Sequence, residues 1–394
     1  MLGAIYIGLS GMNAYSKGLQ TISNNVANLN TAGFKATSVS FSDVFNAGGV
    51  GSSYFGSGAS GLGSGVKLAD SGVDFGQGDL RATDGDLDLA LQGNGLLVLL
   101  DGDKTYFTRT GHFVVDESGY IVEQGSGYRL AVLDDANQPV ALNIDSHRTS
   151  APVATTKISF GENLSAIDTE AAVSDIAVYD SMGERHVWKV TLTPVGAASP
   201  GEWKVAVTDE HGAVGEGTIS FSAGVIDSDG ATVTITQALD VAEDLAVTLD
   251  FSKVTGFSFG TDSTVKAAEV DGHATGALVS ATIDTDGQVK LTYSNEETAE
   301  LGYVAIADFR DPQALERVGN GLFENAGDGE YRLLASGTYG IGKLVGGQME
   351  ASNVDLSEQF GDLILIQRGF QASSQVVSVS NDMIQQLFGI RGQG

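Results

Sequence analysis

The chain of 394 residues is long enough for two or three domains, each with its own core. Its 50 acidic residues outnumber 21 basic ones, and a net charge of −29 argues against nucleic-acid binding, which needs a basic surface. The absence of cysteine excludes disulfides and thiolate metal or redox sites.

The negative charge is concentrated in the middle of the chain. Residues 1–72 carry a net charge of +1 and residues 345–394 carry −3, which leaves about −27 between them. Near-neutral ends suit close packing in an assembly, and an acidic middle suits a solvated exterior. No basic segment precedes an apolar stretch at the start, and the longest apolar runs, such as 96–100, are too short to span a bilayer. By themselves these features predict a cytoplasmic protein without a secretory signal peptide.

The first thirty residues predict a helix. Large apolar side chains recur there at steps of three or four residues, with the small Ser16 filling one position of the stripe. This first stripe consists of Ile5, Leu9, Met12, Leu19, Ile22, Val26 and Leu29. Asn and Gly residues then cluster over 24–35, which predicts a helix end, a tight turn and a re-entry anchored by Phe34.

Residues 47–65 are rich in Gly and Ser and predict a flexible connector. Residues 56–61 match G-x-G-x-x-G, but a dinucleotide site needs a strand before this motif and a helix after it. The low-complexity surroundings favour a linker instead.

The middle of the chain predicts β-structure in a nested order. Residues 73–148 alternate short apolar runs with turn signals such as Asp101-Gly102. Residues 149–288 are Thr- and Val-rich with regular short strands, which predicts a sandwich or barrel. From about 291 to 347 the sequence again resembles residues 73–148, with short apolar runs between turn signals. The fold class is therefore mainly β with terminal helices.

No motif in the middle requires a ligand. Asp84-Gly-Asp86-Leu-Asp88 begins like a calcium loop, but Leu89 and Gly95 occupy the positions that need Gly and Glu. The turns at 227–230 and 284–287 leave an adventitious calcium site open. The five histidines lack metal-binding spacing. We predict no cofactor, no metal site and no enzymatic activity.

The C-terminal run predicts a second, longer helix over about 356–388. Asp355 and Glu358 have capping-box spacing, and Gly389 is placed to stop the helix. A second stripe recurs at coiled-coil spacing and includes Ser373 and Ser380. Its large residues are Leu363, Ile366, Phe370, Val377, Ile384 and Leu387.

Two features of this helix leave alternatives open. Gly361 and Gly369 each cost about 1 kcal/mol in a helix relative to Ala. They indicate either close approach of a neighbouring helix or a helix that is weak until it assembles. The two terminal helices are either ordinary core helices of one domain or a pair that packs together and against copies from neighbouring subunits.

Several motifs resemble those of the flagellar rod and hook proteins. The first is a helix that ends in Ala-Asn-x-x-Thr-x-Gly-aromatic-basic, here Ala27, Asn28, Thr31, Gly33, Phe34 and Lys35. Residues 350–358 and 367–372 resemble the matching C-terminal signature, and residues 87–95, 106–111 and 119–120 resemble the first shared β-domain motif. The motifs recur in the family's order over about half the chain.

The resemblance implies a structural subunit that polymerises into the flagellar hook, the flexible universal joint between rod and filament. It implies a helical core domain from residues 1–71 and 349–394, an inner β-domain from 72–148 and 289–348, and an inserted outer β-domain from 149–288. The residues of the two stripes are then the expected helix seam, through which the subunits polymerise. Implied partners are further copies of the chain, the distal rod, the hook cap, the hook–filament junction proteins and the type III export apparatus. The expected location is extracellular, after export without cleavage.

Two other functions stay open at this point. A distal-rod subunit would share both terminal signatures, but such proteins are usually shorter and lack a large inserted domain. A secreted acidic β-rich adhesin or enzyme would need a localised site in the middle domains and no matched helical stripes at both ends.

Overall fold

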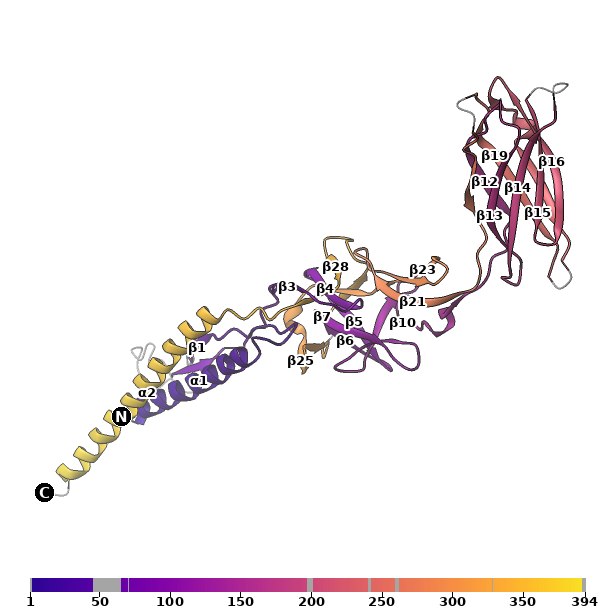
Figure 1. Ribbon diagram of the computed structural model, residues 1–394. Helices are drawn as coiled ribbons and strands as arrows, with labels where there is room; N and C mark the ends of the chain where they lie inside the picture. Colours follow the sequence, from indigo (N-terminus) through magenta and orange to yellow (C-terminus); the bar gives the residue numbers. More distant parts are fainter. Residues whose placement is uncertain are drawn as a thin grey trace. The chain divides into compact units, whose positions relative to one another are not determined.

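The computed structural model describes residues 2–44, 65–69, 71–196, 201–239, 242–258, 262–327 and 329–391. The predicted connector at 47–65, apart from Gly65, and the Gly-rich motif at 56–61 lie outside these residues. The chain divides into two compact units. Unit 1 comprises Met1–Asp145, Ala281–Lys290 and Glu300–Gly394, and unit 2 comprises Ser146–Ser280 and Leu291–Ala299. The fold is mainly β with two terminal helices, as the sequence predicts (Figure 1).

The two terminal helices pack against each other within unit 1 (Figure 1). Helix α1 spans Leu2–Ala27 and helix α2 spans Leu356–Arg391. The Asp355 half of the predicted capping box is confirmed, because its carboxylate accepts hydrogen bonds from the backbone N–H groups of Ser357 at 2.7 Å and Glu358 at 3.3 Å. The predicted stop at Gly389 is wrong, since the helix continues to Arg391. Glycine weakens a helix without ending it unless the backbone turns left-handed there.

The β-structure of unit 1 comes from both halves of the chain. Its first half supplies β1 (Phe41–Asp43), β2 (Val66–Leu68), β3 (Leu80–Ala82), β4 (Asp88–Gly93), β5 (Leu96–Asp101), β6 (Lys104–Thr108), β7 (Thr110–Val115), β8 (Ile121–Glu123), β9 (Arg129–Leu133) and β10 (Pro139–Ala141). Its second half supplies β24 (Ile306–Phe309), β25 (Glu316–Gly319), β26 (Leu322–Glu324), β27 (Tyr331–Leu334), β28 (Gly342–Gly346) and β29 (Gln348–Glu350). The short 3₁₀ helices η1 (Asp145–His147) and η3 (Pro312–Ala314) lie between strands.

Strand β5 is central to unit 1. It pairs with β6, β9 and β24, and its first four residues are buried. Leu97 and Leu99 join one hydrophobic cluster, whereas Leu96 and Val98 join another. A strand covered on both faces has no polar side, which explains the continuous apolar run in the sequence.

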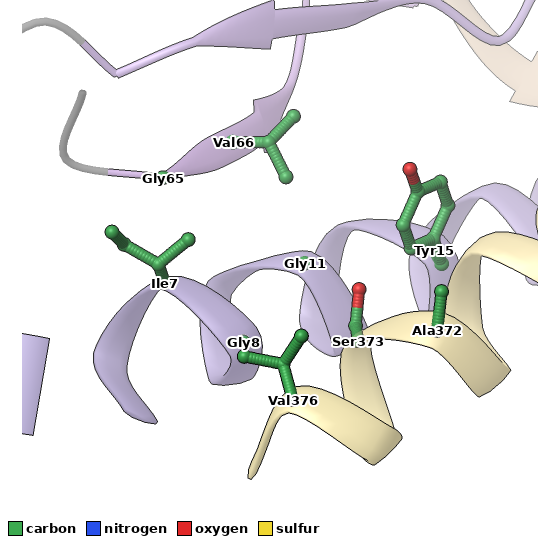
Figure 2. Close-up of a pocket in the computed structure, with 9 residues that line it drawn as sticks. All are labelled: Ile7, Gly8, Gly11, Tyr15, Gly65, Val66, Ala372, Ser373 and Val376. Atoms are coloured by element: carbon green, nitrogen blue, oxygen red, sulfur yellow. The ribbon is translucent and has the colours of Figure 1, made fainter. Parts of the chain in front are cut away.

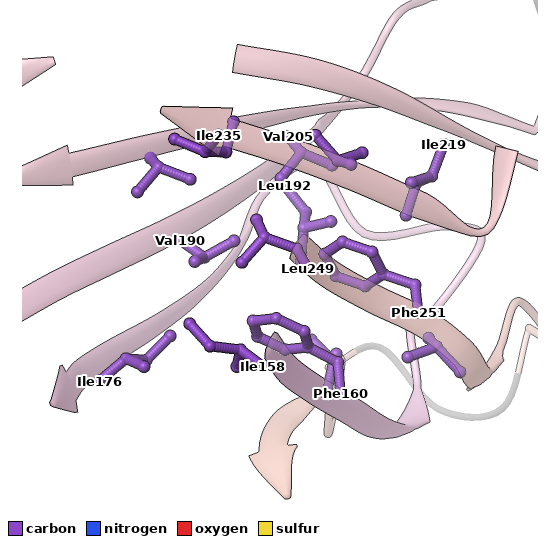
Figure 3. Close-up of a cluster of buried hydrophobic side chains, with 14 of the residues drawn as sticks. Ile158, Phe160, Ile176, Val190, Leu192, Val205, Ile219, Ile235, Leu249 and Phe251 are labelled. Carbon is purple, nitrogen blue, oxygen red and sulfur yellow. The ribbon is translucent and has the colours of Figure 1, made fainter. Parts of the chain in front are cut away.

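Unit 2 folds around one core. A nine-stranded sheet has the order β13-β14-β15-β16-β17-β19-β12-β20, with β18 on β19. Its strands are β12 (Lys157–Asn163), β13 (Ala171–Tyr179), β14 (Arg185–Pro194), β15 (Glu202–Asp209), β16 (Gly212–Ser222), β17 (Val225–Ile226), β18 (Thr232–Gln237), β19 (Leu245–Thr255) and β20 (Lys266–Val270), with η2 at Ser228–Gly230. Inward side chains of these strands converge, and Phe160 stacks on Phe251 at 4.6 Å between ring centres (Figure 3).

The boundary between the two units falls within strands. Strands β21 (Gly276–Ile283), β22 (Gln288–Tyr293) and β23 (Thr298–Val304) each contribute residues to both units, and β11 (Thr149–Ser150) pairs with β21. The division of unit 1 into a helical and a β part, with the predicted boundaries, remains a prediction. Among the described residues, neither helix combines the length and apolar character needed to cross a bilayer.

Candidate assembly interface

Helix α1 presents its smallest residues to α2. Gly8, Gly11 and Gly18 are buried on the contact face. A Cβ atom at Gly8 would lie 2.7 Å from Val377 Cγ2 and 3.1 Å from the backbone oxygen of Ser373. Because Gly8 faces Val377 whereas Gly18 faces Ile366, the helices run antiparallel. The glycines let the two backbones approach more closely than side chains would allow.

The second predicted stripe lies partly in this contact. Ile366 is 4% exposed and Ser380 is 6% exposed, while Leu363, Val377 and Ile384 are half-buried. Phe370, by contrast, is 42% exposed. Gly369, the residue before it, faces α1 instead, and a Cβ atom at Gly369 would lie 2.5 Å from the Tyr15 ring.

The first predicted stripe is only partly buried. Of its members only Ile22 is fully buried. Leu9 is 55% exposed and Leu19 is 37% exposed, and Ile5, Met12, Val26 and Leu29 are half-buried. The closest approach of the two helices within one chain uses glycines, which an apolar pattern does not count. The side chain of Leu387 lies outside the described residues. The polymerisation role of both stripes remains a prediction.

The helix pair exposes many large apolar side chains. On α1 these are Tyr6, Ile7, Leu9 and Leu19. On α2 they are Leu356, Phe360, Ile364, Leu365, Phe370, Val376, Val379, Met383 and Phe388. We call these residues the outward apolar set. An exposed apolar surface of this extent is typical of a protein–protein interface.

A shallow apolar groove of about 410 Å³ lies where β2 meets the helix pair (Figure 2). Its floor contains Gly8 and Gly11, and Ile7, Val66 and Val376 stand around it. Ser10 links the elements, since its hydroxyl donates to the Ile7 carbonyl at 2.7 Å and accepts from the Val66 N–H at 3.2 Å. The groove therefore belongs to the same apolar surface as the outward apolar set.

A buried ionic cluster ties both ends of the chain to the β-structure. Lys35, Arg109 and Glu350, which we call the clasp, are each at most 1% exposed. Lys35 Nζ donates to Glu350 Oε1 at 2.6 Å, and Arg109 Nε donates to Glu350 Oε2 at 3.2 Å. Arg109 also donates to the backbone oxygen of Gly95 at 2.5 Å and to that of Leu91 at 3.3 Å. One carboxylate thus holds segments that are 315 residues apart in sequence.

The clasp holds the ammonium group of Lys35 away from water. Burial lowers the pKa of Lys35, and the Glu350 carboxylate opposes this shift by favouring the charged ammonium. The Gly78 N–H donates to Glu350 Oε1 at 2.7 Å, and Lys35 Nζ also donates to the Gly76 carbonyl at 2.8 Å. Such full hydrogen bonding is what allows buried charges to persist.

A second polar contact fixes the two helices relative to each other. Asn25 Nδ2 donates to Gln359 Oε1 at 2.9 Å, and both residues are buried. The Asn25 amide also bonds in both directions with the backbone of Thr37, at 2.9 and 3.0 Å. Because a shift of one helix along the other would break the hydrogen bond between these two buried amides, the pair favours one register.

The apolar patterns could not find Arg109, Glu350, Asn25 or Gln359. Glu350 and Arg109 lie within two of the segments that resemble the rod and hook family, but nothing in the sequence pairs them. Among the residues that the structure describes, no group of three His, Asp or Glu side chains forms a metal site.

Family comparisons match three parts of the chain. The matched descriptions are "Flagella basal body rod protein" at residues 5–35, "Flagellar basal body protein FlaE D2 domain" at 141–273 and "Flagellar basal body rod FlgEFG protein C-terminal" at 345–390. The flagellar hook protein FlgE of Salmonella typhimurium is 30% identical, with the alignment covering 97% of this chain and 98% of the relative. The chain belongs to the flagellar hook protein family. The hook protein of Treponema pallidum is 28% identical over 99% of this chain and 100% of its own length.

Among solved structures, a Helicobacter pylori flagellar hook protein, FlgE2, is 14% identical with a TM-score of 0.47, covering 67% of this chain and 98% of that one.

In this member of the hook protein family, the N-terminal signature surrounds the clasp. Ala27 ends α1, and the Thr31 hydroxyl donates to the Asn28 side chain at 3.1 Å. Gly33 has a φ of +67° and its N–H donates to the backbone oxygen of Glu350 at 2.7 Å. Phe34 lies under the Arg317 guanidinium at 5.1 Å. The two terminal signatures therefore meet in space.

Proposed function

We propose that this chain is a structural subunit that polymerises through its terminal helices into the bacterial flagellar hook. The carrying observation is the alignment with curated hook proteins over nearly the full length, at 28–30% identity. The matched region 141–273 covers most of the predicted outer domain at 149–288, so it does not favour a shorter distal-rod subunit. The matched families and the aligned relatives are all flagellar, which does not favour a secreted adhesin.

The outward apolar set supplies the contacts that polymerisation needs. Fully burying one Leu, Phe or Met side chain contributes about 1.5–3 kcal/mol. Association costs about 4–15 kcal/mol in lost freedom, so several of these side chains must be covered together. Helix α2 carries nine of them, which is enough for such an interface.

The same surfaces would repeat with a rotation that does not close, which generates a helical tube. We place the terminal helices on the inner wall of this tube and the β-domains, with the boundaries predicted above, in its outer layers. The clasp then connects the inner wall to the first β-domain. Acidic outer domains that make small, wet contacts would slide past one another, which gives bending flexibility while the helical wall carries torque.

The partners and location follow from this assignment. Its main partner is another copy of the same chain. The distal rod, the hook cap and the hook–filament junction proteins would meet the ends of the tube. We place the tube outside the cell, after passage of the chain through the flagellar type III export apparatus. The role is structural and requires no catalysis.

Electron microscopy of purified protein tests this function. The full chain is expected to form tubes, and Leu365→Asp is expected to prevent them, because Leu365 is 68% exposed in one chain and becomes buried in the proposed wall. Met182→Asp is the matched control, since Met182 is 64% exposed in unit 2. Tubes that form equally well from both variants would contradict a helical polymerisation surface.

A further inference from the structure

Arg317 on β25 is a cation without a carboxylate partner among the described residues. One guanidinium nitrogen donates to the Lys35 backbone oxygen, and the guanidinium lies over the Phe34 ring. Arg317 lies at an exposed position on β25, where partial desolvation lowers its pKa and no charged neighbour contributes to this shift. The guanidinium therefore has further N–H groups for which the described residues provide no acceptor.

Arg317 is one of the residues that line a pocket of about 440 Å³. Asn24, Asn28 and Thr31 line one side at the end of α1. The hairpin of β25 and β26 lines the other, with Asn320 and Gly321 in its turn at φ values of 51° and 74°. The pocket thus combines a guanidinium with polar side chains in a partly enclosed space.

Among the described residues, the pocket is lined by two cations and by no carboxylate, although the chain as a whole is acidic. Its charged lining residues are Lys35, which is paired with Glu350, and Arg317, whereas Glu316 and Glu324 lie on the flanking strands without lining it. The whole chain has 50 acidic residues against 21 basic ones, so a neighbouring copy presents mainly carboxylates. A guanidinium binds a carboxylate through two parallel hydrogen bonds, a geometry that an ammonium does not match.

We propose that the pocket at the end of α1 binds an Asp or Glu side chain from a neighbouring copy of the chain, with Arg317 as its principal ligand. This inference rests on the proposed polymer. It adds a charge-specific contact on unit 1 to the apolar contact of the helices, and such a contact fixes orientation as well as affinity.

The test uses a covalent cross-link in assembled tubes. Arg317→Lys keeps the positive charge and supplies an amine, which a carbodiimide condenses with a touching carboxylate; the amide forms, and the carbodiimide takes up the lost water to become a urea. Tubes are grown from a mixture of isotope-labelled and unlabelled chains, and mass spectrometry identifies peptides that join two chains. We expect residue 317 to be joined to an Asp or Glu of another chain.

Arg332→Lys controls the chemistry. Arg332 is paired with Asp308 at 2.5 Å within one chain, so the variant is expected to cross-link to Asp308 in monomers and tubes alike. If this control reacts while residue 317 forms no link, or forms only links within its own chain, the proposal is overturned.

A second measurement uses the critical concentration for assembly. Arg317→Ala is expected to raise it about ten-fold, because a charge-assisted hydrogen bond is lost from the interface. Arg332→Ala is expected to leave it unchanged. If Arg317→Ala changes neither the critical concentration nor the thermal stability of the monomer, the proposed binding of a carboxylate in the pocket is overturned. If the wild-type chain itself forms no tubes, the proposed function fails instead, so the two failures are distinguishable.

Discussion

Glu350 is the residue on which the clasp depends. Its carboxylate is fully buried and faces two cations, Lys35 and Arg109. Glu350→Gln would keep the shape but leave two buried positive charges without a counter-ion. Breaking a buried ionic cluster in this way costs about 3–5 kcal/mol. We expect the free energy of unfolding of unit 1 to fall by this amount in urea, followed by far-ultraviolet circular dichroism.

The two tryptophans, Trp188 and Trp203, provide an internal reference for this experiment. Both lie in the core of unit 2, so tryptophan emission follows unit 2 alone. The matched control is Glu316→Gln, the same chemical change at an exposed position on β25. Equal unfolding free energies for Glu316→Gln and Glu350→Gln would show that the clasp does not hold unit 1 together.

Unit 2 contains a carboxyl group, that of Asp250, whose pKa is lowered by a neighbouring lysine. Lys157 Nζ lies 2.7 Å from Asp250 Oδ2, and this hydrogen bond lowers the pKa of Asp250 from 3.8 to about 2. Because the folded-state pKa is the lower one, the contribution to stability is present above about pH 4 and is lost as the pH falls from about 4 to about 2. Lys157→Met is therefore expected to move acid unfolding of unit 2 to higher pH.

The shift should be modest, about half a pH unit or less, since Lys157 is half-exposed and water screens the pair. Tryptophan emission against pH measures it. Lys204→Met, which removes an ion pair between two exposed side chains, is the control and should leave the midpoint in place. A coincident midpoint for both variants would refute the role of Asp250.

At the scale of the helices, Gly361 and Gly369 of α2 have different surroundings. Nothing lies within 4 Å of a Cβ atom at Gly361, whereas one at Gly369 would meet the Tyr15 ring at 2.5 Å. Gly361→Ala is expected to stabilise unit 1 by about 1 kcal/mol through helix propensity. Gly369→Ala is expected to destabilise it by about 1–3 kcal/mol, because the ring, which packs against Phe41, must move.

Urea unfolding of the two variants, followed by circular dichroism, distinguishes the effects. A stabilising Gly369→Ala would mean that the helices do not approach as closely as the structure shows. Of the two alternatives that the sequence left open, close approach applies at Gly369, and a helix that is weak until it assembles remains a prediction.

The elements themselves were predictable, and the buried face of each helix was predictable only in part. Periodicity located both helices and most strands, because apolar spacing reflects local geometry. It selected Leu9 and Leu19 as contact residues, whereas the contact uses Gly8 and Gly11. A glycine contributes nothing to an apolar pattern, although it permits the closest packing.

The clasp could not be predicted from sequence patterns, for a different reason. Lys35 and Glu350 are brought together by the whole fold of unit 1, and no local spacing encodes a contact across 315 residues. A buried lysine also contradicts the ordinary expectation that lysine is exposed. Resemblance to a family marked both segments as important without giving the physical reason, which is the shared carboxylate.

On the scale of the whole molecule, α2 is longer than its partner within the chain. Gly8 faces Val377 and Gly18 faces Ile366, so by the same antiparallel register Leu2 lies opposite about residue 382. The residues of α2 from about 383 to 391 therefore extend beyond α1. A helical end of fewer than ten residues is only marginally stable in water without a packing partner.

Assembly should supply that partner, and hydrogen exchange can detect it. In monomers we expect the backbone amides of 383–391 to exchange rapidly, and in tubes we expect them to slow by ten-fold or more, because packing against neighbouring chains adds free energy to the helical state. The buried strands of unit 2, such as β14 and β15, serve as the control, since their core is complete within one chain and their exchange should be the same in both states. Equal exchange of 383–391 in monomers and tubes would mean that the end of α2 lies outside the subunit contacts, and the wall would then be built from the α1–α2 contact region and the groove beside β2.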